Sequence, residues 1–588
     1  MPARRGPGDG TRGARHTIVT VPSPIRADFA NTIAVGRRWA VPKLGGASDA
    51  PRPSPTGAVP ILADVEKRPR GRRLAWSTAI FSLATGLSRI LGLVREIVAA
   101  YYFGAAGKIN AFTVALQVPN LVRSLVADAA LSSAFVPVFS ELLEKGERKR
   151  AWRVASSLFW LMLLGLGALT ALFIVIAPIV IAPFGDPGGD RALAIGLSRV
   201  LFPVVALLGV SGIVVGILNS YEHFSVPALT PVFWNLAIIA GLVLGVPHAH
   251  SIDAKLYVYA VSIVVGTVIQ VLLPLPWLRG RDDRLRVALD WRDPAVRRVF
   301  VLMVPVTIGL GLINFNLVVN SIFASRFIDP NIAPSAIDKA FRIYMLPQGM
   351  FSVAVATVLF PRLARLATRE DMDGFRHTVA LGLRQIAFTL VPASAFSAVL
   401  AEPIVRLIYQ RGAFDPNQTP VVAGALAAFS LGLTFNGAML MLNRAFFSLQ
   451  TPWTPTAIAL GNLGLNTVLA AALYRVGTWG IPLATSLANI AGAAVLLVAL
   501  RRRIGRVEFG ETARATALIT MAAAVLAAVA FPVWHVLDGA AGRSLGGQVI
   551  SLGSALLAGF AAYLISCRLL GVRELEALLS LLSRFRRG

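Results

Sequence analysis

Long uninterrupted apolar runs dominate this sequence and constrain its fold more than any other feature. A helix needs about 20 apolar residues to cross roughly 30 Å of hydrocarbon, and the chain has fourteen runs of sufficient length. None of them shows the alternation of apolar and polar residues that a transmembrane barrel requires. With 56% hydrophobic and only 15% charged residues, the chain is predicted to be an all-α polytopic membrane protein. The predicted spans are 77–103, 110–143, 151–184, 191–220, 226–247, 255–278, 296–327, 336–367, 375–409, 419–447, 453–475, 479–502, 513–536 and 546–570.

The basic residues lie in alternate loops. Arg and Lys are frequent in 144–153, 279–298, 361–370, 501–514 and the C-terminal tail, and few in the intervening loops 185–192, 246–255, 328–336 and 411–420. The formal net charge of +26 therefore reflects membrane topology, and nucleic acid is not an expected partner. Because the number of predicted crossings is even, the positive-inside rule places both termini in the cytoplasm.

The chain also resembles itself at an offset of about 225 residues. FVPVF at 135–139 matches LFPRL at 359–363, and SVPALTPVFWNL at 225–236 matches QTPWTPTAIALGNL at 450–463. A duplication of six spans gives two parallel lobes around a central cavity and predicts alternating access. The predicted domains are a basic disordered extension at 1–75, a first lobe at 76–280, a second lobe at 281–505, and two additional helices with a basic tail at 506–588. The extension is interpreted as a tail that is solvated or touches lipid headgroups. The alternative interpretation is that the start site has been assigned too far upstream.

Several charged side chains lie inside the predicted spans, where a central arginine costs roughly 2.5–3.5 kcal/mol. They are Arg89, Arg95, Arg123 and Arg342, with Glu96 and Asp128 as acids. Pro119 and Pro347 lie near the middle of their spans, where a kink shapes a cavity. Four guanidinium groups favour an anionic ligand, because they match phosphate oxygens and stay charged. The alternative is that Arg89 and Arg95 reach the interface or pair with the two acids, and Lys339 is interpreted as a charge at the end of a loop.

Enzyme chemistry finds no support in the sequence. The single cysteine, Cys567, lies in the last predicted span and excludes a disulfide framework or a cysteine metal site. The six histidines are scattered without metal-ligand spacing. FGAAGKIN lacks the glycine spacing and the Ser or Thr of a phosphate-binding loop.

Segment 88–146 resembles the signature region of the bacterial lipid II flippases, the MurJ or MviN family, through SRILGLVRE, PNLVR and AFVP. The similarity extends over everything after about residue 75 and places the chain in the multidrug/oligosaccharidyl-lipid/polysaccharide exporter superfamily. It implies a transporter of the bacterial plasma membrane that flips lipid II, the lipid-linked peptidoglycan precursor. The family's cationic cavity accepts the pyrophosphate-linked head, and a groove along the two additional helices holds the polyprenyl tail. The pyrophosphate-binding role is carried onto Arg89, Arg95, Arg123 and Arg342.

The chain departs from the family pattern at several positions. Asn110 stands where family members often have an acid at the start of the second helix, and Met345 where some have one after the eighth-helix arginine. Some members hold sodium on an Asn and an Asp one turn apart, and the matching residues here are Asn462 and Asn466. Sodium near these two residues, or chloride, is the candidate ion, and no other cofactor is expected. The residues expected to support or gate the cavity are Glu96, Asn110, Pro119, Asp128 and Pro347.

A net positive cavity predicts that the inside-negative membrane potential drives the transport cycle. The expected partners are lipid II, membrane lipids and proteins of cell-wall synthesis.

Two alternative functions are also compatible with the sequence. The first alternative is a flippase for another polyprenyl-pyrophosphate-linked sugar. The second is a non-transporting scaffold for cell-wall synthesis, which would be expected to lose the cavity arginines.

Overall fold

A computed structural model describes residues 67–126, 129–505 and 509–576. Within these ranges every regular element is a helix, which confirms the predicted fold class. Ten of the described helices are each long and apolar enough to cross a bilayer, and a pair bent by 43°, Pro416–Ser430 and Leu433–Ser448, would make an eleventh. The count of fourteen spans stays a prediction. Asp128, most of the predicted extension and the end of the basic tail lie outside the described residues.

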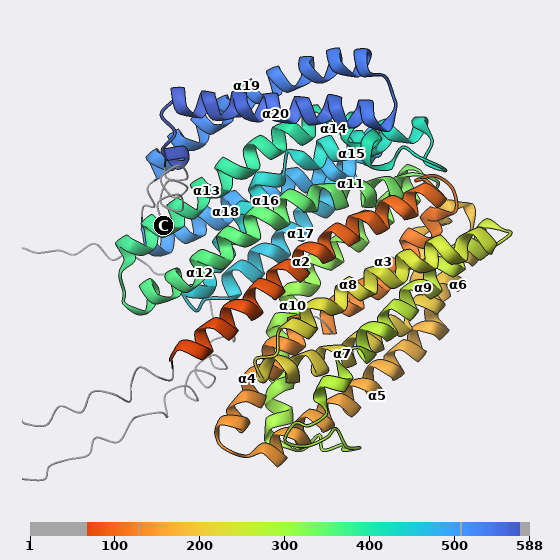
Figure 1. Ribbon diagram of the computed structural model, residues 1–588, viewed down its shortest axis with the longest axis vertical. Helices are drawn as coiled ribbons and strands as arrows, with labels where there is room; N and C mark the ends of the chain where they lie inside the picture. Colours follow the sequence, from red (N-terminus) through yellow and green to blue (C-terminus); the bar gives the residue numbers. More distant parts are fainter. Residues whose placement is uncertain (1–66, 127–128, 506–508, 577–588) are drawn as a thin grey trace, which may run out of the picture. The chain divides into compact units, whose positions relative to one another are not determined.

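The helices are described in chain order for the two predicted halves (Figure 1). The first half holds α2 (Lys67–Phe103), α3 (Ile109–Val126), α4 (Ala129–Glu144), α5 (Arg148–Ile181), α6 (Arg191–Leu201), α7 (Pro203–Ser220), α8 (Ser225–Ala240) and α9 (Ile252–Leu272). The second holds α10 (Pro294–Phe323), α11 (Ala333–Pro347), α12 (Val353–Thr368), α13 (Met372–Val399), α14 (Ala401–Tyr409), α15 (Thr419–Ser430), α16 (Leu433–Ser448), α17 (Trp453–Leu473) and α18 (Gly480–Ile504). The additional pair is α19 (Phe509–Ala541) and α20 (Leu545–Leu569). α6 and α7 together form one span, Arg191–Ser220, whereas the corresponding pair in the second half is bent by 43°.

Two predicted boundaries are wrong. α2 begins at Lys67, inside the stretch expected to be disordered, because the Arg, Leu and Ala residues before the apolar run favour a helix. The predicted span 110–143 contains α3 and α4, and residues 127–128 between them lie outside the described ranges. The predicted span 375–409 ends at Val399, and the amphipathic segment with Glu402 and Arg406 forms the separate helix α14.

Buried apolar side chains form two clusters, one for each half. The first gathers residues between Ala99 and Val318, and the second gathers residues between Ala324 and Leu575 together with Ala100 and Ala105. Helix α10 was predicted to open the second lobe, yet it contributes Val318 to the first cluster and packs on α3, α4 and α17. α10 therefore connects the two halves through packing as well as through the chain.

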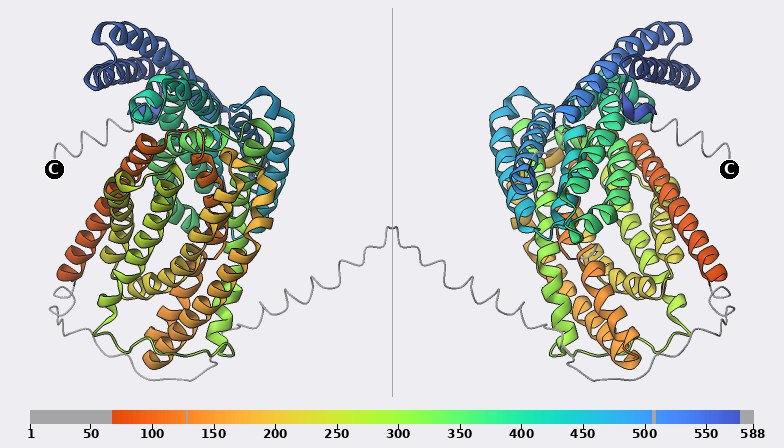
Figure 2. Two further views of the ribbon diagram at one scale, coloured as in Figure 1. Left: turned by 90° about the vertical axis from the view of Figure 1, so that its right-hand side faces the viewer. Right: turned by 90° about the vertical axis from the view of Figure 1, so that its left-hand side faces the viewer.

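The additional helices α19 and α20 pack against each other and against α13 (Figures 1 and 2). Two ion pairs fasten them at opposite ends of their hairpin. Arg384 of α13 lies 3.1 Å from Glu574, just beyond α20, and Arg406 of α14 pairs with Asp538 near the end of α19. All four side chains are mostly buried, and removing one partner of such a pair leaves an uncompensated charge. The hairpin is thus fixed to the second half.

A small ionic cluster orders the low-charge end of the first half. Lys108, just before α3, lies 2.7 Å from Asp253 and 3.0 Å from Asp190. Asp190 also caps α6 by accepting a hydrogen bond from the Leu193 backbone N–H at 2.8 Å. The hydrogen bonds to the two carboxylates raise the pKa of Lys108. The Leu193 N–H and Lys108 lower the pKa of Asp190, so Lys108 and Asp190 both stay charged at neutral pH.

Candidate functional site: a cationic central cavity

A cavity of about 1430 Å³ lies between the two halves. All four predicted arginines line it: Arg89 and Arg95 from α2, Arg123 from α3, and Arg342 from α11. Lys339 adds a fifth cation, and Glu96 and Asp338 are the two carboxylates in its lining. Five positive and two negative groups give a formal charge of +3. The structure thus brings the predicted arginines together, and their binding of pyrophosphate stays a prediction.

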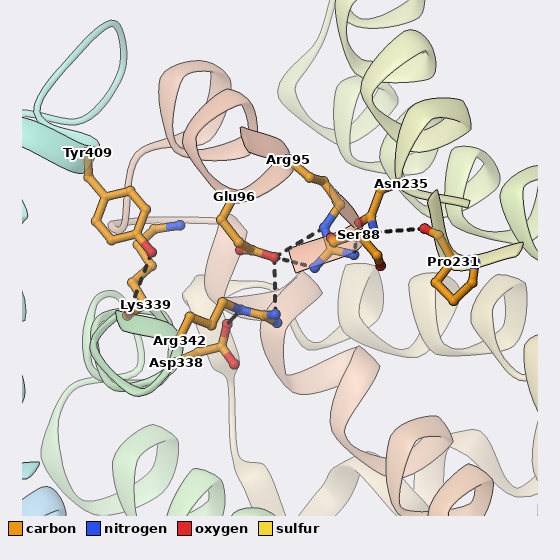
Figure 3. A network of polar contacts seen from close by, with 9 residues as sticks. All are labelled: Ser88, Arg95, Glu96, Pro231, Asn235, Asp338, Lys339, Arg342 and Tyr409. Carbon is orange, nitrogen blue, oxygen red and sulfur yellow. Dashed lines mark hydrogen bonds and ion pairs between the residues drawn. The ribbon is translucent and has the colours of Figure 1, made fainter. Parts of the chain in front are cut away.

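Glu96 connects the arginines of the two halves (Figure 3). Its Oε1 accepts a hydrogen bond from Arg95 Nη2 at 2.6 Å and lies 3.1 Å from Arg342 Nη1. Arg342 also donates from Nε to Asp338 at 2.8 Å, one turn earlier on α11. The predicted pairing of Arg95 with Glu96 therefore forms. It is part of a network that crosses the cavity.

Two residues that the sequence reasoning missed hold Arg95 in place. Arg95 Nη1 donates to Asn235 Oδ1 at 3.1 Å, and its guanidinium lies 4.8 Å from the centre of the Trp234 ring. Asn235 is itself anchored, because its Nδ2 donates to the Pro231 carbonyl at 2.9 Å and to that of Ser88 at 3.4 Å. Trp234 and Asn235 lie within the repeat segment SVPALTPVFWNL, whose buried polar Asn was the available signal.

Arg89 and Arg123 lie away from this network. Arg89 is exposed and faces Gly349 across the cavity, where an added methyl group would lie 3.1 Å from its Nη1. Gly349 belongs to a π-helical turn at 348–352 that directly follows Pro347, which agrees with the predicted distortion at this proline. Arg123 follows Pro119 on α3 and lines the cavity from the first half.

Lys339 is a cavity residue, so its interpretation as a loop-end charge is wrong. It lies in the second turn of α11 with only 5% of its surface exposed, and its Nζ is 5.6 Å from the centre of the Tyr409 ring. The error arose because α11 begins at Ala333, three residues before the predicted start of the span, which moves Lys339 deeper into the helix.

The cavity is closed at the end that carries the low-charge loops. Asn110, at the start of α3, is fully buried. Its Nδ2 donates to the Asn331 carbonyl at 2.5 Å, and its Oδ1 accepts from the Ser335 N–H at 2.8 Å. The Ala105 N–H donates to Gln418 Oε1 at 2.6 Å, which joins the halves a second time. Asn110 therefore lies where a gating residue was expected, and it works through neutral hydrogen bonds.

The predicted ion site in the second half is a cluster of amides. Asn466 on α17 donates from Nδ2 to Asn316 Oδ1 at 2.6 Å and to Asn320 Oδ1 at 2.8 Å. Asn462 lies one turn earlier on α17, close to Gly492 of α18. No group of three or more His, Cys, Asp or Glu side chains that could hold a metal occurs in the described ranges. Asn462 Oδ1 and Asn466 Oδ1 are buried and accept no hydrogen bond within the described residues, so a sodium ion near these two residues stays a prediction.

A comparison with protein families decides the assignment. The protein-family model described as lipid II flippase MurJ matches residues 99–541 of the chain. The chain belongs to the lipid II flippase MurJ family. This MurJ family member is 31% identical over 519 residues to the probable lipid II flippase MurJ of Vibrio cholerae, covering 85% of this chain and 97% of the relative. It is 32% identical over 465 residues to the probable lipid II flippase MurJ of Rhizobium meliloti, covering 76% and 84%. The resemblance seen in the sequence is confirmed.

Solved structures share the fold of this MurJ family member. A lipid II flippase MurJ in an inward closed conformation matches with a TM-score of 0.68 and 24% identity, over 84% of this chain and 98% of that one. An inward-facing multidrug resistance MATE family transporter of the MOP superfamily matches with a TM-score of 0.60 and 14% identity, over 72% and 95%. The chain therefore shares its fold with both solved transporters.

Proposed function

We propose that this chain flips lipid II from the inner to the outer leaflet of the bacterial plasma membrane by alternating access, for cell-wall synthesis. The observation that supports this most is the central cavity. Both halves contribute arginines to its lining, and it is closed at the end that carries the low-charge loops. With the basic loops and both termini in the cytoplasm, the closed end faces outward. The structure then corresponds to a state that receives substrate from the inside.

Glu96 acts in this proposal as a resident anion that the substrate replaces. In the structure its carboxylate pairs with both Arg95 and Arg342. A pyrophosphate offers more negative charge and more acceptor oxygens than one carboxylate, and guanidinium forks bind such oxygens bidentately. Its binding frees Arg342 from Glu96, while the ligand takes over the connection between the halves. Substrate arrival is thereby coupled to a rearrangement between the two halves.

The membrane potential is the proposed driving force. The empty cavity carries a formal charge of +3, and each charge moved across 100 mV changes the free energy by about 2.3 kcal/mol. An inside-negative potential therefore favours the empty cavity facing the cytoplasm, whereas the loaded cavity, partly neutralised by pyrophosphate, responds less. The potential returns the empty protein to its receiving state.

Growth rescue tests the proposal. In a bacterium depleted of its own lipid II flippase, this chain should restore growth and the appearance of lipid II in the outer leaflet, measured by its accessibility to an external lipid II-degrading enzyme. Collapse of the membrane potential in these cells should slow that appearance. A chain that reaches the membrane but exports no lipid II would contradict the proposal and favour another polyprenyl-pyrophosphate-linked sugar or a scaffold.

Replacing Asn466 by aspartate is expected to make the stability of the protein depend strongly on sodium. The carboxylate would place three acceptor oxygens together, with those of Asn316 and Asn320, without the amide protons that now join them. A buried cluster of acceptor oxygens with a negative charge is stable only when it binds a cation or a proton. Thermal unfolding of the purified variant should shift upward by several degrees when sodium replaces choline, whereas the wild type should not respond. A sodium-stabilised wild type would show that the amide cluster itself binds the ion.

A further inference from the structure

The linker between the two halves is fastened to the first half at its basic end. Residues 279–293 connect the helix pair α8–α9 to α10. The Arg286 N–H donates to Ser156 Oγ at 3.1 Å, and the Asp290 N–H donates to Ser157 Oγ at 3.3 Å. Trp160 Nε1 donates to the Arg286 carbonyl at 3.0 Å. These contacts to α5 hold the linker in a defined path up to the start of α10.

A second cavity, of about 570 Å³, lies where this linker meets α10. Its lining comprises Trp291, Arg292, Arg297, Phe300, Val301 and Val304. The linker supplies the first two of these residues, and α10 supplies the others. The Arg292 guanidinium lies 5.2 Å from the centre of the Trp291 ring. The second cavity is thus formed jointly by the fastened linker and the first helix of the second half.

Its two arginines have no carboxylate partner within the part of the chain that the structure describes. Two neighbouring acids pair with other arginines, since Arg150 lies 3.6 Å from Asp293 and Arg298 lies 2.7 Å from Glu141. The exposed Asp290 forms no ion pair within the described residues. Asp293 also accepts from the Ala295 N–H at 2.7 Å, capping α10. Arg292 and Arg297 are exposed, so the second cavity presents two positive charges that remain available to an external anion.

An apolar stripe continues from these charges along α10. Arg297, Val301 and Val304 follow one another at helical spacing on one face, and the valines are 62% and 55% exposed. Trp291 is 65% exposed, which is typical of an aromatic side chain at the boundary between headgroups and hydrocarbon. The surface therefore changes from cationic to apolar over two turns, which matches the layers of one lipid leaflet.

We propose that this cavity binds one anionic phospholipid of the leaflet on the basic side, at a site separate from the central cavity. The phosphate lies between Arg292 and Arg297, and an acyl chain runs along Val301 and Val304. Charge complementarity selects an anionic over a zwitterionic lipid. The bound lipid bridges the linker and α10, and so ties the junction between the two halves to the membrane.

Native mass spectrometry of the purified full-length protein tests this site. Phosphatidylglycerol should bind with a first dissociation constant roughly tenfold or more below that of phosphatidylcholine with the same chains. The double variant Arg292→Gln/Arg297→Gln should lose about tenfold or more in affinity for phosphatidylglycerol. Trp291→Ala keeps both charges and should also weaken binding. Unchanged thermal unfolding of the lipid-free variants verifies that they are folded.

The matched control is Arg502→Gln/Arg503→Gln, which removes two exposed charges at the end of α18 and should leave the first binding event intact. An equal loss in this control would overturn the proposal in favour of a general positive field. Equal affinity for phosphatidylcholine would show that the site is an apolar groove without charge selectivity, and it would overturn the proposal. Competition by deacylated glycerophosphoglycerol as strong as by the whole lipid would show a free-phosphate site, and it would also overturn the proposal.

Discussion

Arg342→Ala is expected to abolish growth rescue and lipid II export while the protein still reaches the membrane. Arg342 is the only guanidinium that the second half contributes to the lining of the central cavity within the described residues. Its removal leaves a bound pyrophosphate in contact with the first half alone, so the ligand cannot couple the halves. Removing one partner from a mostly buried ion pair lowers the free energy of unfolding by about 3–5 kcal/mol, although Glu96 still pairs with Arg95 in the variant. We therefore expect at least about a hundredfold loss of transport.

Three further variants make this experiment specific. Arg342→Lys keeps the charge but loses the fork that binds Glu96 and Asp338 together, so partial rescue is expected. Arg369→Ala removes an exposed arginine just after α12, outside the cavity lining, and should rescue fully. Glu96→Gln should weaken rescue less than Arg342→Ala, because it removes the resident anion and keeps every cation. Full rescue by Arg342→Ala at normal expression would contradict the assignment of the cavity.

The sequence predicted the four arginines and Glu96 of the cavity, but not Asp338, because the cost of a charge in a membrane is a local property. An arginine inside an apolar run stands out without knowledge of its neighbours. The same reasoning failed for Lys339, since it depended on where a helix begins. It also missed Asn235, which Arg95 contacts across 140 positions of sequence. Partners at such separations are set by helix packing, which apolar periodicity alone does not encode.

The fold shows the same division between local and distant information. Apolar length gave the helical class and the order of most helices, and the repeat predicted that both halves follow one plan. Apolar length did not show that α10 packs into the core of the first half, because this depends on which faces meet. Nor did the Asn at position 466 reveal that its amide would bond Asn316 and Asn320, 150 and 146 positions away.

Gly104→Ala is expected to open the cavity at the end that carries the low-charge loops and to shift the protein away from the proposed receiving state. Gly104 follows α2 with a φ of +65°, and an added Cβ would lie 2.5 Å from the Ala413 carbonyl oxygen and 2.9 Å from Gln418 Oε1. Both contacts belong to the second half, so the clash acts across the junction that Gln418 and Ala105 close. Overpacking of this kind costs about 1–3 kcal/mol, and each 1.4 kcal/mol changes a population about tenfold.

Gly107→Ala is the matched control for this change. Gly107 has a similar φ of +75°, but nothing lies within 4 Å of a Cβ added there, so it carries the backbone strain without the clash. Ser335→Cys, placed in a Cys567→Ser background, reports opening because Ser335 is 1% exposed and its backbone N–H donates to Asn110. Labelling by an impermeant maleimide should accelerate about tenfold or more with Gly104→Ala and much less with Gly107→Ala. Equal acceleration in both would trace the effect to strain in the loop, and no acceleration in either would show that this contact does not hold the halves closed.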